Sequence, residues 1–389
     1  MPHRRFRVPW RRNSGAVPNA MRATYLDWNA TAPVRPEATA AVVAALSALG
    51  NPSSVHRAGR AARRLLAEAR ATVAALVGAQ PDAIVFTSGG TEANALALQA
   101  FPGRRPIVSA LEHDSVLAAA PDAAVIPARA DGRVDLAALD ARLGDDPRPA
   151  LVSLMLANNE TGVIQDVAAA AAIAHRRGAL LHCDAIQVAG KIAVDIAALD
   201  VDLMSLSAHK LGGPMGVGAL VVRHALPLQP LLRGGGQERR LRAGTENLPG
   251  IAGFGAAASA AAAALDAYAR IAILRDDMQQ RLLALAPDAV VFGAEATRLP
   301  NTLCLAMPWV ASSTQVIALD LAGVMVSAGS ACSSGKVARS HVLDAMGVAP
   351  ALAECAIRIS LGWSTREADI DHLIDAWGAL YARTRASAA

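Results

Sequence analysis

The chain has 389 residues, which is enough for two domains that each bury a sizeable core. Hydrophobic residues make up 53% of it and aromatic residues only 3%, so the cores must be packed mainly with alanine, leucine, valine and isoleucine. The net charge of +4 comes from residues 1–20, which hold five arginines and no acidic residue. The basic balance therefore gives no reason to expect a nucleic-acid partner.

The four cysteines, Cys183, Cys304, Cys332 and Cys355, are scattered and form no C-x-x-C pair. This spacing favours free thiols in a reducing compartment, so we expect a cytoplasmic protein. No pair of residues has the spacing of a zinc site, and no metal is expected. Cys183, Cys304 and Cys355 lie in apolar runs and are interpreted as core residues.

Two segments have the length or position of a targeting signal or a membrane span. Residues 1–23 lack the apolar stretch of a signal peptide, so a disordered extension is expected, with a targeting role as the alternative. Residues 247–265 carry no charge over 19 positions, a length that fits a membrane span. Their content is mainly alanine and glycine, so a buried helix is predicted and no membrane partner is expected.

In chain order, a strand-like run at residues 24–26 precedes a helix at 56–77, where Leu65, Ala69 and Val73 recur at helical spacing. Short apolar runs bounded by turn residues predict buried strands at 84–86, 106–109, 124–126, 151–155, 179–183, 203–206 and 218–222. Helical stretches, such as 167–177, lie between several of them. This alternation indicates a mostly parallel sheet covered by helices.

After about residue 262 the pattern changes. A long helix runs through 275–285, strands are predicted at 301–306, 324–327 and 356–360, and a last helix starts at Glu367. We predict an α/β protein with a large domain, residues 37–262, whose mostly parallel sheet is flanked by helices. A smaller α+β domain is predicted to combine residues 24–36 and 263–389.

Lys210 lies directly after a predicted strand and before two glycines. That position puts an amine at the carboxyl edge of the sheet, where open α/β sheets bind ligands. A lysine held in a Schiff base avoids the protonation that makes a free lysine a poor nucleophile. The alternative is a solvated surface lysine.

Asp184 ends the strand before that one, and Gln187 follows a turn later. A carboxylate at the ring nitrogen is what pyridoxal phosphate (PLP) needs to act as an electron sink, and Gln187 is placed to bond the ring hydroxyl. The alternative is that Asp184 caps a helix. Residues 87–92, with Gly90 and Thr91, join a strand to a helix, so their amides are suited to holding a phosphate.

The order of phosphate turn, His113, Asp184 and Lys210 resembles the layout of fold-type-I PLP enzymes. Segments along nearly the whole chain resemble class V aminotransferases and, among them, the cysteine desulfurases of the iron–sulfur-assembly and nitrogen-fixation type. The similar segments are residues 25–31, 51–56, 87–92, 112–113, 158–162, 184–187, 207–210, 242–245, 327–332 and 358–360. Met215 departs from many relatives, which carry lysine there.

The resemblance implies a role for each matching position. The phosphate is expected to contact Thr91, Ser207 and His209, and Thr245 is expected to reach the cofactor of a partner subunit in a homodimer. His113 is expected to stack on the ring and move protons. Asn159 and Arg358 are expected to bind the substrate carboxylate, a role that suits a guanidinium.

Cys332 lies among small residues at 327–335, a composition that indicates a mobile loop. An inert core cysteine is the alternative. The resemblance implies that Lys210 moves protons while the Cys332 thiolate takes the sulfur of L-cysteine, giving alanine and a persulfide for an acceptor such as an iron–sulfur scaffold protein. Selenocysteine lyase, another class V lyase or aminotransferase, and a non-catalytic assembly scaffold are the competing interpretations.

Overall fold

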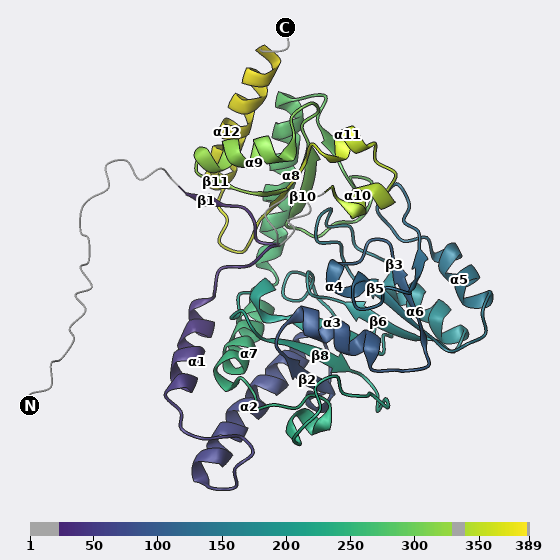
Figure 1. The fold of residues 1–389 in the computed structure, drawn as a ribbon. Helices are drawn as coiled ribbons and strands as arrows, with labels where there is room; N and C mark the ends of the chain where they lie inside the picture. The colour runs from purple at the N-terminus through teal and green to yellow at the C-terminus, as the bar shows by residue number, and fades with distance from the viewer. Residues whose placement is uncertain (1–22, 329–338, 387–389) are drawn as a thin grey trace, which may run out of the picture.

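The computed structural model describes residues 23–328 and 339–386. Of the extension expected to be disordered, residues 1–23, all but Ala23 lie outside this range. The central sheet has seven strands in the order β2-β8-β7-β6-β5-β3-β4 (Figure 1). Every neighbouring pair is parallel except the two that β8 makes. These strands are β2 (Ile84–Thr87), β3 (Arg105–Ser109), β4 (Ala124–Ile126), β5 (Ala150–Met155), β6 (Leu180–Asp184), β7 (Leu203–Ser207) and β8 (Gly218–Val222).

Helices cover both faces of this sheet, which explains why its strands read as continuous apolar runs. Ile84 and Phe86 of β2 pack into one apolar cluster, and Val85 between them packs into another. The first cluster includes residues of α2 (Arg57–Leu76), α5 (Leu136–Gly144), α6 (Val167–Arg176) and α7 (Leu248–Ala263), and α1 (Pro36–Leu46) packs against α7. The second includes α3 (Gly90–Gln99) and α4 (Asp114–Leu117). The predicted mostly parallel, helix-covered sheet is confirmed.

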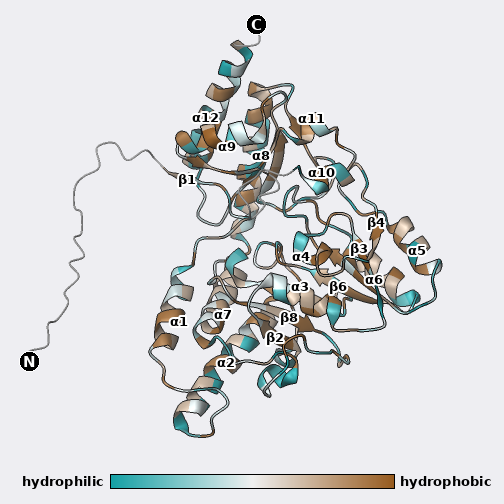
Figure 2. Cartoon of the chain, in the orientation of Figure 1, coloured by the Kyte–Doolittle hydropathy of each residue, from teal (hydrophilic) through white to brown (hydrophobic). Residues whose placement is uncertain are grey.

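The C-terminal part forms a second, antiparallel sheet in the order β12-β13-β10-β9. A separate apolar cluster surrounds the fully buried Trp377. Figure 2 shows hydrophobic segments in this part of the chain as well as in the part with the seven-stranded sheet. The strands are β9 (Val290–Val291), β10 (Thr302–Ala306), β12 (Ser327–Ala328) and β13 (Ala356–Ser360). The helices are α8 (Ala267–Leu285), α9 (Ser312–Leu321), α10 (His341–Ala345), α11 (Pro350–Ala353) and α12 (Glu367–Ala386).

The N-terminal segment belongs with this second part of the molecule. Strand β1 (Thr24–Tyr25) pairs in parallel with β11 (Val324–Met325), and Leu26 packs in the same cluster as Trp377. The predicted single strand at 324–327 is wrong, because its two halves pair with different partners: β11 with β1, and β12 with β13. The division into two domains at residues 262 and 263 stays a prediction.

Among the described residues, no single helix is both long and apolar enough to cross a membrane, and the α7–α8 pair, which passes by length and composition, is bent by 73°. The uncharged stretch predicted to be a buried helix forms α7, whose Ile251, Phe254 and Ala258 are almost fully buried.

Candidate active site

A cavity of about 360 Å³ lies at the carboxyl edge of β5, β6 and β7. Ten of the residues singled out from the sequence line it, although they come from positions 90 to 358. They are Gly90, Thr91, His113, Asn159, Asp184, Gln187, Ser207, His209, Lys210 and Arg358. The structure therefore brings these sequence-predicted residues into one site.

Lys210 reaches the cavity from a short 3₁₀ turn, Ala208–Lys210, that directly follows β7. Its Nζ donates hydrogen bonds to the carbonyl oxygens of Asn29 at 2.6 Å and Ala30 at 2.8 Å. Burial, and then the positive charge of Arg358, lowers the pKa of Lys210 to about 8. The amine is thus held inside the site, unlike a solvated surface lysine, and is easier to deprotonate than an ordinary one.

Asp184 is the last residue of β6 and is 6% exposed. Its Oδ2 accepts a hydrogen bond from Asn94 Nδ2 at 2.8 Å, and its Oδ1 accepts one from the Ile186 amide at 2.9 Å. Burial raises its pKa. Residues 186–188 form turns and no helix starts there, so Asp184 does not cap a helix. Its carboxylate faces the cavity instead.

The start of α3 forms another part of the cavity wall. No side chain caps this ten-residue helix, so its first amides remain available, and the helix dipole favours an anion there. A Cβ on Gly90 would lie 2.3 Å from Ile186 Cδ1, so the chain passes very close to the cavity wall here. Ser207 and His209 line the cavity too, and burial, followed by the charge of Lys210, lowers the pKa of His209 to about 4. This wall suits a phosphate group.

His113 precedes α4 and caps it. Its Nδ1 accepts a hydrogen bond from the Ser115 amide at 3.1 Å, which assigns the neutral ring's proton to Nε2. Ser115 Oγ lies 2.8 Å from Nδ1 and accepts from Asn94 Nδ2, which also donates to Asp184. His113 and the buried carboxylate are therefore oriented by one hydrogen-bond network.

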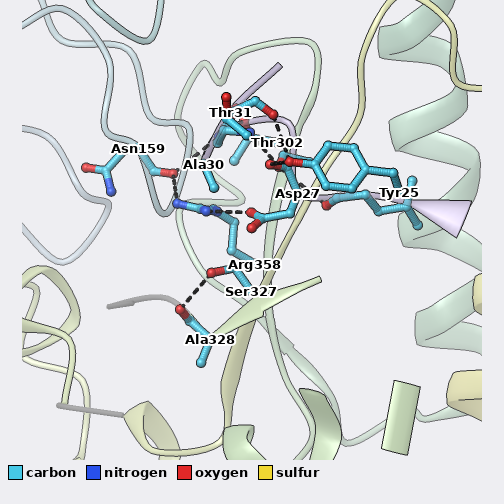
Figure 3. Close-up of polar contacts among 12 residues, drawn as sticks. Tyr25, Asp27, Ala30, Thr31, Asn159, Thr302, Ser327, Ala328 and Arg358 are labelled. Atoms are coloured by element: carbon cyan, nitrogen blue, oxygen red, sulfur yellow. Dashed lines mark hydrogen bonds and ion pairs between the residues drawn. The ribbon is translucent and has the colours of Figure 1, made fainter. Parts of the chain in front are cut away.

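Arg358, on β13, is 4% exposed and already has partners in the structure (Figure 3). Its Nη2 lies 2.7 Å from Asp27 Oδ1, and its Nη1 donates to the backbone carbonyl of Asn159 at 3.2 Å. The Nε atom is buried without a hydrogen-bond partner. Tyr25 supports this arrangement by donating to the Asp27 and Thr31 carbonyls. The contact to Asn159 uses the main chain, so its side-chain amide remains free of Arg358.

The sequence reasoning assigned no role to several residues that line the cavity. Asn29 and Glu160 lie in segments 25–31 and 158–162, so the family resemblance could have identified them. No feature of the sequence pointed to His341. Glu160 is 2% exposed, burial raises its pKa, and its Oε2 accepts from Ser340 Oγ at 2.5 Å. His341 Nε2 lies 2.9 Å from the Glu112 carbonyl. Only tertiary contacts bring these side chains to the site.

One described residue of the predicted site, Thr245, does not line the cavity. Thr245 is exposed in the loop after Gly244, and Arg242 ties that loop to α3 through an ion pair with Glu92. Cys332 lies outside the described residues. The other cysteines are free and buried, as expected for core residues.

Comparison with known proteins identifies the relatives of this chain. Residues 24–373 match the family described as Aminotransferase class-V. A cysteine desulfurase of Cereibacter sphaeroides is 47% identical over 370 residues, covering 91% of this chain and 95% of that protein. One of Klebsiella pneumoniae is 41% identical over 378 residues, covering 94% of each. The solved structure of a NifS-like protein from Rickettsia africae superposes with a TM-score of 0.86 at 35% identity, covering 92% of this chain and 99% of the other. The chain belongs to the class-V aminotransferase family and, within it, to the cysteine desulfurases.

Proposed function

We propose that this protein is a PLP-dependent cysteine desulfurase that converts L-cysteine to L-alanine and leaves a persulfide on Cys332. The observation that supports this best is the convergence of ten predicted cofactor and substrate residues on one cavity. When bound, PLP supplies an electron sink for charge that develops on the substrate carbons.

The residues present fit this cofactor. The uncapped start of α3 at Gly90 and Thr91, with Ser207 and His209, would hold the phosphate. The buried carboxylate of Asp184 would pair with the ring nitrogen, and its bonds from Asn94 and the Ile186 amide fix its orientation. Lys210 would hold the cofactor covalently, and Thr245 would contact the cofactor of a partner subunit in a homodimer.

We assign substrate binding to Arg358 and Asn159, and proton transfer to Lys210 and His113, all of which line the same cavity. Arg358 would bind the substrate carboxylate, a proposal supported by its place in the cavity wall and by its buried Nε, which has no hydrogen-bond partner. Its Nη atoms contact Asp27 and the Asn159 carbonyl. Asn159 would add its side-chain amide. Lys210, with its pKa lowered to about 8, can take and return a proton near neutral pH. His113 carries its proton on Nε2 and is a second candidate for this task.

In the sulfur-transfer step, the Cys332 thiolate attacks the sulfur of the substrate. A sulfur–sulfur bond forms and the carbon–sulfur bond breaks. The electron pair of the broken bond stays with the carbon fragment, which takes up a proton and leaves as alanine. The persulfide then passes its outer sulfur to an acceptor, which we propose to be a scaffold protein of iron–sulfur assembly in the cytoplasm.

The test is to incubate the purified protein with PLP, L-cysteine and a thiol reductant that releases the bound sulfur, and to measure sulfide and alanine together. The two products should form in equal amounts. Cys332→Ser should lower both by at least about 100-fold, because a hydroxyl is a poor nucleophile. Cys355→Ser is the matched control and should keep near wild-type activity, because Cys355 is a core residue. Alanine formation by Cys332→Ser at the wild-type rate would contradict the proposal.

A further inference from the structure

A second lysine is buried behind the cavity. Lys191 follows β6 by seven residues and is 3% exposed. Its Nζ donates to Gln187 Oε1 at 2.9 Å and to Asn29 Oδ1 at 3.0 Å. Burial, and then the positive charges of Lys210 and Arg358, lowers the pKa of Lys191 well below its usual value. Two N–H groups of the amine are engaged by side-chain oxygens of residues that line the cavity.

The composition of the chain makes this lysine unusual. Only three of its 37 basic residues are lysines, namely Lys191, Lys210 and Lys336. Arginine occupies the other basic positions, and a lysine differs from it in having a compact amine that can lose its charge. Lys210 and Lys191 both contact Asn29, Lys210 at its main-chain carbonyl and Lys191 at its side-chain oxygen.

Gln187 connects Lys191 to the cavity. Its side chain lines the cavity, and its Nε2 donates to the Asn29 carbonyl at 3.0 Å. A primary amide has one acceptor oxygen and two N–H groups. The Gln187 oxygen accepts a hydrogen bond from the amine of Lys191. If the Gln187 amide turned over, its NH₂ group would face that amine, which is also a donor. The remaining N–H of Gln187 is then the polar group that it offers to the cavity.

On the basis of the proposed function, we propose that Lys191 is a positioning residue that fixes Gln187 as a hydrogen-bond donor toward the PLP ring hydroxyl. A donated hydrogen bond favours the ionised form of such a hydroxyl. Lys191 thereby sets the ionisation of the bound cofactor without touching it.

Lys191→Met tests the inference because methionine has a similar length and no N–H. PLP should bind about tenfold more weakly, since the amide of Gln187 then keeps only its bond to the Asn29 carbonyl and is held less firmly as a donor. The pH at which the visible spectrum of the bound cofactor changes should move upward, because the ionised hydroxyl loses a donor. Lys191→Gln restores an NH₂ group and should recover part of both effects. Thermal melting of the apoproteins checks that each variant folds.

The decisive measurement is a double-mutant cycle with Gln187→Ala. If Lys191 acts through Gln187, adding Lys191→Met to Gln187→Ala should change the PLP dissociation constant and the spectral midpoint by less than about twofold. Fully additive changes, or a Lys191→Met protein with wild-type affinity and spectrum, would overturn the inference. Failure of the wild-type protein to bind PLP would instead overturn the proposed function.

Discussion

The two ends of the cavity are built in different ways. The sheet end consists of Gly90, Asp184, Ser207 and Lys210, which lie at or shortly after the ends of β2, β6 and β7. The composite end is formed by Asn159 and Arg358, and Asp27 pairs with Arg358 without lining the cavity. These three residues come from a loop of the large sheet, a strand of the second sheet and the N-terminal segment (Figure 3).

The two ends of the cavity differ in how far the order of residues along the chain determines them. In the sheet end, strand order and the positions of residues after each strand already bring the side chains together, because the carboxyl ends of parallel strands share one edge. In the composite end, residues 331 positions apart form a partly buried ion pair, which depends on how the two sheets pack. We therefore expect changes at the sheet end to affect cofactor binding, and changes at the composite end to affect substrate binding.

The largest effect is expected for Lys210→Ala at the sheet end. Loss of the attachment and proton-transfer amine should lower alanine formation by at least about 1000-fold. Borohydride reduction of the wild-type protein followed by peptide mapping should place the cofactor on Lys210. A label on Lys191 or Lys336 would contradict the assignment.

Arg358→Lys tests the composite end. Lysine keeps the charge but not the two-pronged geometry, so kcat/KM for L-cysteine should fall by about 10- to 100-fold, mainly through a higher KM. The PLP dissociation constant should change little. Equal losses of cofactor and substrate affinity would show that the two ends are not separable.

Gly218→Ala should disturb the sheet end through its backbone. The added Cβ would lie 2.6 Å from the Gly89 carbonyl carbon and 2.8 Å from the Leu206 carbonyl oxygen, so β8 or the turn before α3 must shift. We expect a loss of about 1–3 kcal/mol in the free energy of unfolding and weaker PLP binding, measured by denaturant titration and by cofactor titration. Gly236→Ala is the control, since nothing lies within 4 Å of its added Cβ.

The smallest expected effect is that of the Arg358 charge, at the composite end, on the pKa of Lys210, at the sheet end. Burial and the nearby Arg358 disfavour the ammonium form of Lys210, so it should lose its proton near pH 8, below the 10.5 of an ordinary lysine. The rate at which PLP joins the apoprotein should therefore rise with pH around a midpoint near 8. Arg358→Gln should move this midpoint upward, whereas Arg358→Lys, which keeps the charge, should leave it in place. An unchanged midpoint in both variants would show that Arg358 has no influence on Lys210.

The sequence by itself determined the mostly parallel sheet, the position of Lys210 and Asp184 at its edge, and the family. Each of these follows from the succession of residues along the chain, in which an apolar run is followed by a turn and a functional residue comes directly after a strand. It also identified Arg358 and Asn159, through their resemblance to a family and not through any periodic pattern.

Only the tertiary structure decided which partners these residues have. It paired Arg358 with Asp27, used the main chain of Asn159, divided residues 324–327 between two sheets, and buried Lys191 against Gln187 and Asn29. The physical reason is that such contacts join segments that are distant in the chain or lie in irregular loops. Their geometry follows from the packing of two separate apolar cores, which leaves no periodic signal in the sequence.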